Sequence, residues 1–364
     1  MRNKTFDKIK AVACIFVILI HCKFPSVYGD LFEALARFGV PMFFAIAGVY
    51  LSASSANGQA ETDNFRRNIM RKLKRTGAVT LKVWAIYTLY SFVYAMAAKY
   101  GAAAWFKEKF NSFEFSRLIL FNSGKFIYDF TYGFDHMWYL LALLYVYFLC
   151  YMFAPAVRVL SKPLTIILLG FLFLGEMLQI YYPIRPFGIN ISTWYVVRNW
   201  LFVGIPFTML GYWMKESGAV KKIKQPMTLG SVLVITGVFS TLAEFKLWGQ
   251  VEVYVGSLII VLGLLIVGLD AGSDRSLIET KKTEEPRSLL SYIGENLSSN
   301  IYYYHVMVIS VLGFLTDRVY PDAYENAFFM YLRPVIVITI TILISLLIYM
   351  VKFITFNSNK NLRK

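Results

Sequence analysis

Apolar stretches of about twenty residues recur along the chain, and short segments rich in Lys and Arg separate them. A stretch of this length crosses the hydrocarbon core of a bilayer as an α-helix. The pattern predicts an all-α, polytopic membrane protein with about ten transmembrane helices, near residues 9–24, 34–54, 76–98, 136–153, 164–182, 196–214, 227–246, 251–270, 297–316 and 329–354. We expect one integral-membrane domain over residues 1–356 and a short polar cytoplasmic tail over residues 357–364.

The composition excludes a water-soluble protein. Apolar residues make up 57% of the chain and charged residues only 16%, against about 25% charged in an ordinary soluble domain. A net charge of +15 could suggest nucleic-acid binding, but the basic residues lie between apolar spans and leave no basic surface domain. We therefore expect membrane lipids as partners and no nucleic acid.

The distribution of basic residues predicts the orientation. If the N-terminus is cytoplasmic, the inner segments hold 24 of the 37 Lys and Arg residues. Because positively charged loops stay on the inner side, this bias places both termini in the cytoplasm. The first span is expected to be retained, since Lys23 and Pro25 follow it where a signal peptide would carry small residues.

The first span contains the candidate catalytic set, because ionisable residues inside a span are costly and mark functional sites. Asp7, Lys10 and His21 are separated by three and eleven positions, and eleven residues make three helical turns plus about 20°. All three therefore share one helix face, with His21 about 16 Å from Lys10 along the axis. The alternative is a plain ion pair of Asp7 and Lys10 at the helix end, with His21 marking the outer interface.

The other two histidines lie in later spans. His136 opens the fourth span at the outer face, and His305 lies in the middle of the ninth. Each also has a structural interpretation. His136 could be a member of an interfacial aromatic belt. His305 could be a buried neutral histidine bonded to a neighbouring helix.

A dense basic cluster lies in the loop on the inner side of the third span, with six Lys and Arg residues from Arg66 to Arg75. Such clusters anchor anionic lipid and fix topology, but guanidinium and ammonium groups also hold phosphates. The sequence alone leaves both interpretations open.

Two further sets of residues have simpler readings. Cys14, Cys22 and Cys150 form no CxxC pair and no metal-ligand spacing, so we expect neither a disulfide nor a metal.

Small residues in the second span, Gly39 and Gly48 among them, allow close helix approach. This approach could also leave a narrow tunnel beside His21.

These residues together resemble the integral-membrane acyltransferase-3 family over nearly the whole chain. The most specific mark is a basic residue, ten intervening positions and a histidine in the first span, here Lys10 and His21, with a preceding acid, here Asp7. The family's Phe-Phe-x-x-Ser-Gly signature reads Phe-Phe-Ala-Ile-Ala-Gly at residues 43–48.

Three weaker motifs add to the resemblance. Lys72 and Arg75 align with a cytoplasmic Arg-x-x-Arg pair, residues 136–140 are similar to a His-x-Trp-Tyr-Leu segment, and residues 301–305 are similar to an Ile-Tyr-x-x-His segment. Ala47 replaces the usual serine, which leaves packing as its role. Lys72 replaces an arginine and loses the bidentate contact with phosphate.

The resemblance implies an enzyme of the bacterial cytoplasmic membrane that transfers an acetyl or other short acyl group. The donor would be cytoplasmic acyl-CoA, and the acceptor would be a hydroxyl of an extracytoplasmic or lipid-linked glycan. His21 would act as the general base, and Lys10, paired with Asp7, would position the donor or balance charge. The CoA phosphates would lie against Arg71, Lys72, Lys74 and Arg75. The candidate acceptor-binding residues are Arg37, His136, Trp138, Arg198, His305 and Arg333.

Other readings stay open at this stage. An acyl-enzyme would need a nucleophile such as Cys14 or Ser52. A transporter or flippase for a glycan or lipid-linked intermediate would use Glu176 and His305 as proton-coupling residues. The oligomeric state, the acceptor and the acyl group are not defined by the sequence, and a homo-oligomer is compatible with it.

Overall fold

The computed structural model describes residues 3–51, 59–125, 135–181, 197–274 and 288–361, which form helices with no strand among them. The α-helices are α1 (Lys4–His21), α2 (Ser26–Ala36), α3 (Gly39–Val49), α4 (Gln59–Ala97), α5 (Ala102–Lys109), α6 (Ser112–Phe121), α7 (Trp138–Met152), α8 (Ala154–Tyr181), α10 (Ile205–Glu216), α11 (Pro226–Trp248), α12 (Val255–Asp274), α13 (Leu289–Tyr292), α14 (Ser298–Val319) and α15 (Ala327–Asn361). Further short segments of 3-10 or π-helix are η1 (Asp135–Met137), η3 (Trp200–Gly204), η4 (Ala219–Lys222), η5 (Ile293–Leu297) and η6 (Pro321–Glu325).

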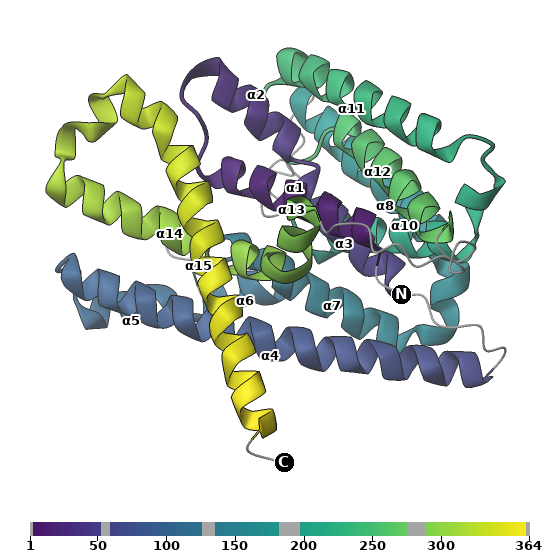
Figure 1. Ribbon diagram of the computed structural model, residues 1–364, viewed down its shortest axis with the longest axis horizontal. Helices are drawn as coiled ribbons and strands as arrows, with labels where there is room; N and C mark the ends of the chain where they lie inside the picture. The colour runs from purple at the N-terminus through teal and green to yellow at the C-terminus, as the bar shows by residue number, and fades with distance from the viewer. Residues whose placement is uncertain (1–2, 52–58, 126–134, 182–196, 275–287, 362–364) are drawn as a thin grey trace.

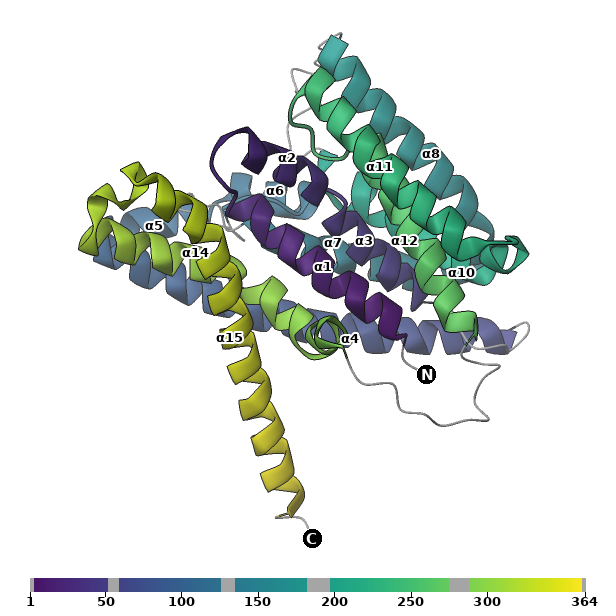
Figure 2. The same ribbon diagram turned by 45° about the horizontal axis from the view of Figure 1, so that its top comes forward.

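Helix α1 lies at the centre of the bundle (Figures 1 and 2). One of its faces, with Ala11, Cys14 and Ile18, packs in an apolar cluster with α14 and α15. Its opposite side, with Phe6 and Ala13, belongs to the larger core formed with α3, α7, α10 and α12. Helix α1 therefore joins the two halves of the bundle, and side chains at its ends meet residues from both.

Each of the ten expected spans coincides with a helix or a pair of short helical segments. Among the described residues, six helical segments are long and apolar enough to cross a membrane, and Trp138–Met152 is a shorter apolar helix. The all-helical, multi-pass fold is confirmed to this extent. The count of ten crossings and the cytoplasmic position of the termini stay predictions.

Two segments differ from their sequence-based description. The second span is not one continuous helix, because α2 ends at Ala36 and α3 begins at Gly39. Pro41 has no N–H to donate and is best tolerated in the first turn of a helix, which is where it lies in α3. The basic cluster, expected in a loop, lies instead within α4. Residues 59–75 contain neither Gly nor Pro, so nothing in them interrupts a helix.

Glycines allow two backbone contacts that fix the position of the core helices. A Cβ placed on Gly48 of α3 would lie 1.9 Å from the carbonyl oxygen of Thr208 in α10. A Cβ on Gly294 of η5 would lie 1.6 Å from the carbonyl oxygen of Asp7 in α1. The small residues of the second span therefore serve close packing, as one of their two interpretations predicted.

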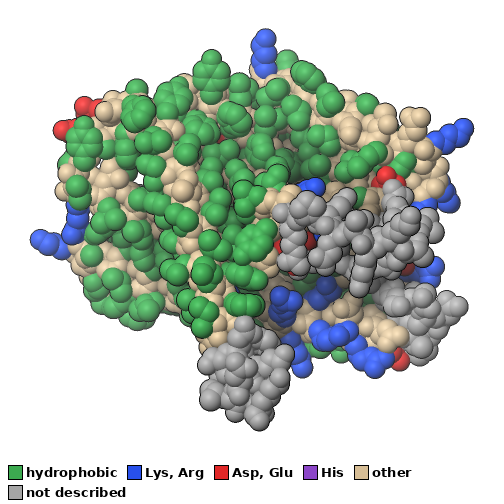
Figure 3. Space-filling view, in the orientation of Figure 1, with side chains coloured by type: hydrophobic (Ala, Val, Ile, Leu, Met, Phe, Trp, Pro, Cys, Tyr) green, Lys and Arg blue, Asp and Glu red, His purple; other side chains and the backbone are tan. Residues whose placement is uncertain are grey.

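Large apolar side chains cover much of the outer surface. Figure 3 shows them over most of one face, with Lys and Arg gathered mainly along its edges. Val159 on α8, Phe239 on α11 and Phe328 on α15 are exposed to 75%, 68% and 75%. Such a surface is stable in contact with lipid and unstable in water, which agrees with the spans predicted from hydropathy.

Two buried polar groups order the connection between α11 and α12. The Glu244 carboxylate accepts hydrogen bonds of 2.8 Å each from the backbone N–H groups of Val255 and Gly256. It thereby satisfies free donors at the N-terminus of α12, where the helix dipole favours negative charge. The buried Tyr254 hydroxyl donates to the carbonyl oxygen of Gly249 at 2.9 Å. Residues 249–254 are thus held in a defined shape.

Candidate active site

Three histidines from distant parts of the chain meet at the end of α1. His21 is the last residue of α1, His136 lies in η1 and His305 lies in α14. The ring centroid of His305 is 5.2 Å from that of His21 and 5.2 Å from that of His136. His136 and His305 are buried, and His21 is half-buried. We call these three residues the histidine cluster.

Hydrogen bonds define which ring nitrogens carry protons in two of these histidines. His305 Nδ1 lies 3.1 Å and 2.9 Å from the carbonyl oxygens of Ile301 and Tyr302. Carbonyl oxygens only accept, so Nδ1 carries the hydrogen and Nε2 of neutral His305 is an acceptor. His136 Nε2 lies 3.3 Å from the carbonyl oxygen of Tyr303, which makes its Nδ1 the acceptor by the same reasoning. Each of these two rings therefore keeps one nitrogen as a proton acceptor.

Tyrosines hold the position of His136. The Tyr302 hydroxyl donates to the backbone carbonyl of His136. The Tyr87 ring packs against the His136 ring with centroids 4.9 Å apart, and its hydroxyl donates to the carbonyl oxygen of Tyr303 at 2.8 Å. Helices α4, α14 and η1 are thereby joined around one imidazole, which restricts its rotation.

A narrow cavity of about 40 Å³ opens beside His21. Its walls come from α1, α3, α14, the connection between α2 and α3, and the segments that precede α7, α10 and α12. Val40 and Pro41 of the second span border it, whereas the small residues Gly39 and Gly48 do not. The polar and aromatic side chains that line it are His21, Arg37, His136, Trp138, Arg198, Glu252 and Tyr302.

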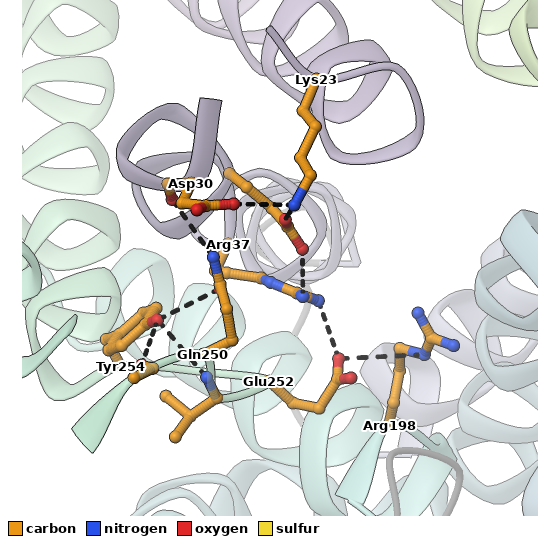
Figure 4. A network of polar contacts seen from close by, with 10 residues as sticks. Lys23, Asp30, Arg37, Arg198, Gln250, Glu252 and Tyr254 are labelled. Atoms are coloured by element: carbon orange, nitrogen blue, oxygen red, sulfur yellow. Dashed lines mark hydrogen bonds and ion pairs between the residues drawn. The ribbon is translucent and has the colours of Figure 1, made fainter. Parts of the chain in front are cut away.

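A chain of ion pairs closes one side of this cavity (Figure 4). Arg37 Nη1 lies 3.0 Å from Glu252 Oε2, and Arg37 Nη2 lies 2.8 Å from Glu33 Oε1. Arg198 Nε lies 4.0 Å from the same Glu252 oxygen, and the Arg198 guanidinium lies 5.8 Å from the centre of the Trp138 ring. Two arginines of the cavity thus share one carboxylate.

The ion-pair chain continues toward the surface through Lys23. Its Nζ lies 2.7 Å from Asp30 and 3.4 Å from Glu33. The hydrogen bond to Asp30, and more weakly the charge of Glu33, raises the pKa of Lys23 above its ordinary value, while partial burial opposes this change. Lys23 therefore stays charged at neutral pH and helps to hold Glu33 beside Arg37.

Asp7 and Lys10 lie near the opposite end of α1 from His21. Lys10 Nζ and Asp7 Oδ1 are 2.6 Å apart, with Asp7 only 1% exposed. Removing one partner of a buried pair leaves an uncompensated charge, which is strongly destabilising. The ion pair that the spacing predicted is present.

Cys14 lies one turn above Lys10 and is fully buried. Its thiol donates to the carbonyl oxygen of Ser298 at 3.3 Å. This contact needs the protonated thiol, whereas a nucleophile would need the thiolate. The arrangement disfavours an acyl-enzyme at Cys14. Ser52, the other candidate nucleophile, lies outside the described residues.

The four basic residues proposed to hold phosphates lie within two turns of α4. Arg71, Lys74 and Arg75 are exposed, and Lys72 is half-buried. Further along α4, the Tyr87 hydroxyl donates to the carbonyl oxygen of Tyr303 in α14 at 2.8 Å. Helix α4 therefore connects the basic cluster with the segment of α14 that carries His305.

Comparison with known proteins decides the family. A family model described as an acyltransferase domain matches residues 3–350 of the 364 residues. The chain belongs to the acyltransferase-3 family. No curated protein and no solved structure matches it. The sequence resemblance is thus confirmed over nearly the whole chain.

In this acyltransferase-3 protein, six of the thirteen candidate site residues from the sequence lie near one another. His21, Arg37, His136, Trp138 and Arg198 all line the cavity, and His305 contacts two of them. Arg333 does not line it; its guanidinium lies 5.4 Å from the centre of the Tyr324 ring. Asp7 and the residues of the basic cluster likewise do not line it.

Sequence reasoning missed two residues of the acyltransferase cavity. Glu252 lies in the connection before α12 and pairs with Arg37. Tyr302 precedes His305 by three positions and also lines the cavity. A carboxylate next to an apolar span was a usable signal for Glu252. Its partner, 215 positions earlier in the chain, was not visible in the sequence pattern.

Proposed function

We propose that this protein transfers an acetyl or similar short acyl group from cytoplasmic acyl-CoA to a hydroxyl of an extracytoplasmic or lipid-linked glycan, in a bacterial cytoplasmic membrane. The observation that carries the proposal is the histidine cluster with its cavity at one end of α1, in a chain of the acyltransferase-3 family. The donor carries charged phosphates and remains in the cytoplasm, whereas the acceptor lies outside. A site inside the membrane joins them.

The donor binds on the side of the basic helix. The exposed side chains of Arg71, Lys74 and Arg75 suit the phosphates of CoA, because charge-assisted contacts to phosphate are strong. The pantetheine arm would then extend along α1 toward His21. Lys10, held by Asp7 at 2.6 Å, lies on the same helix and would position the donor on that path.

His21 acts as the general base. It takes the proton from the acceptor hydroxyl as the hydroxyl oxygen forms a bond with the thioester carbonyl carbon, and the C–S bond then breaks. The proton returns from His21 to the sulfur, which leaves as the CoA thiol. An imidazole, with an unperturbed pKa near 6.5, suits both transfers at neutral pH.

His305 and His136 act as positioning residues for this step. His305 lies against His21 and presents Nε2 as an acceptor. Its contacts with two carbonyl oxygens hold its ring in one orientation. His305 also contacts the His136 ring, so the three rings restrict one another's movement and keep the His21 imidazole in place for both proton transfers.

An assay with the purified protein tests this function. Labelled acetyl-CoA is supplied with a panel of glycans, and acetyl ester formation and free CoA are measured together. The proposal predicts equal amounts of ester and CoA. A transporter or flippase, which would use Glu176 and His305 for proton coupling, moves glycan without consuming acetyl-CoA, and that result would exclude the enzyme.

A further inference from the structure

A second, larger cavity adjoins the histidine site. It has a volume of about 290 Å³, against about 40 Å³ beside His21. Small-molecule sites in proteins begin near 300 Å³, so the larger cavity matches a single ring-sized ligand and the smaller one does not. Its walls come from α8, α11, the segment before η3 and the connection that residues 249–254 form. We call it the outer cleft.

The side chains of the outer cleft suit a sugar. Trp248 contributes an aromatic ring at the end of α11, Gln250 an amide and Glu176 a carboxyl group. Aromatic rings pack against the C–H faces of sugar rings, while amides and carboxyl groups bond hydroxyls. The Gln250 amide nitrogen already donates to the carbonyl oxygen of Asp30 at 3.2 Å, which fixes its orientation.

The outer cleft and the histidine cavity share two residues, Arg37 and Glu252. These two side chains are ion-paired at 3.0 Å and form the boundary between the cavities (Figure 4). A ring held in the cleft therefore lies next to the site where His21 acts. A hydroxyl of that ring is the group that reaches past Arg37 and Glu252.

The charges around this boundary balance. The network joins the basic residues Lys23, Arg37 and Arg198 to the acidic residues Asp30, Glu33 and Glu252. Arg37 is bound by two carboxylates, so it offers no uncompensated positive charge to an anionic ligand. The boundary is thus suited to an uncharged sugar, recognised through its hydroxyls.

We propose that the outer cleft binds an uncharged sugar ring of the acceptor, with Trp248 as its stacking surface and Gln250 and Glu176 as its hydrogen-bond partners. This inference rests on the proposed acyl transfer and names the class of acceptor. The ordered connection between α11 and α12 holds the cleft in shape, because Tyr254 binds Gly249 at one end of it.

Steady-state kinetics of three variants test the outer cleft. Trp248→Ala removes the stacking surface, Trp248→Phe keeps an aromatic ring, and Leu247→Ala is the matched control, since Leu247 is 74% exposed and does not line the cleft. The probes are labelled acetyl-CoA and methyl glycosides of neutral hexoses, N-acetylhexosamines and uronic acids. The acceptor-free hydrolysis of acetyl-CoA is measured in parallel.

We expect Trp248→Ala to raise KM for neutral glycosides about tenfold, the size of one aromatic contact. Trp248→Phe restores most of this loss. The KM for acetyl-CoA, the acceptor-free hydrolysis and the Leu247→Ala variant stay at wild-type values. Uronic acid glycosides are no better acceptors than neutral ones.

Other outcomes overturn the assignment in distinguishable ways. An unchanged KM in Trp248→Ala, an equal fall in acceptor-free hydrolysis, or a tenfold preference for uronic acids removes the outer cleft as a neutral-sugar site while acyl transfer stands. If wild-type protein acetylates no glycoside of the panel, the proposed glycan acceptor fails, and the cleft assignment fails with it.

Discussion

Replacing His21 with alanine is expected to lower acetyl transfer by about 10³-fold, the usual contribution of a general base. The His21 imidazole is the last side chain of α1, lines the cavity and lies against the His305 ring. Without it the acceptor hydroxyl keeps its proton and attacks the thioester slowly. The measurement is the initial rate of acetyl ester formation at saturating acetyl-CoA, with the KM for acetyl-CoA determined alongside.

Cys22→Ala is the matched control for this variant, because Cys22 is the next residue, is buried and does not line the cavity. We expect it to retain near wild-type activity. Added imidazole should restore part of the activity of His21→Ala, since a small base can enter the space left by the side chain. Full transfer by a well-folded His21→Ala protein would remove His21 as the base.

Replacing Gly294 with alanine is expected to destabilise the whole bundle. The new Cβ would lie 1.6 Å from the carbonyl oxygen of Asp7, so α1 and η5 must separate. Overpacking of this kind costs about 3 kcal/mol or more, and backbone atoms cannot move aside as a side chain can. We predict a fall of roughly 5–10 °C in the thermal unfolding midpoint in detergent, together with loss of activity because α1 carries His21.

Gly170→Ala provides the comparison. A Cβ at Gly170 in α8 meets no atom within 4 Å, and alanine favours a helix over glycine by about 0.5–1 kcal/mol. The unfolding midpoint of this variant should be unchanged or slightly higher. Equal midpoints for both glycine variants would show that the close contact of η5 and α1 does not support the fold.

Much of the fold could be predicted because a membrane protein repeats a simple pattern. A helix that crosses lipid needs about twenty apolar residues, and each such run in the sequence coincides with helical structure. The ion pair of Asp7 and Lys10 was also predictable, since residues three apart lie on one helix face. These features depend only on neighbours in the sequence.

The break at Arg37 and the assembly of the site could not be predicted in the same way. Pro41 signals a break, but an apolar run over residues 34–54 hides it. The histidine cluster joins positions 21, 136 and 305, and the pair of Arg37 and Glu252 joins residues 215 positions apart. Such contacts depend on how helices pack. The family motifs grouped the three histidines, but nothing in the sequence paired Arg37 with Glu252.

The central claim is that a donor on one side of the membrane meets an acceptor on the other at His21. Proteoliposomes of one orientation test it directly, with labelled acetyl-CoA confined to the side of the α4 basic cluster and a non-permeant glycan confined to the opposite side. The account predicts acetylated glycan on the opposite side, and none when the two compartments are exchanged. Transfer only when donor and acceptor share one compartment would contradict it.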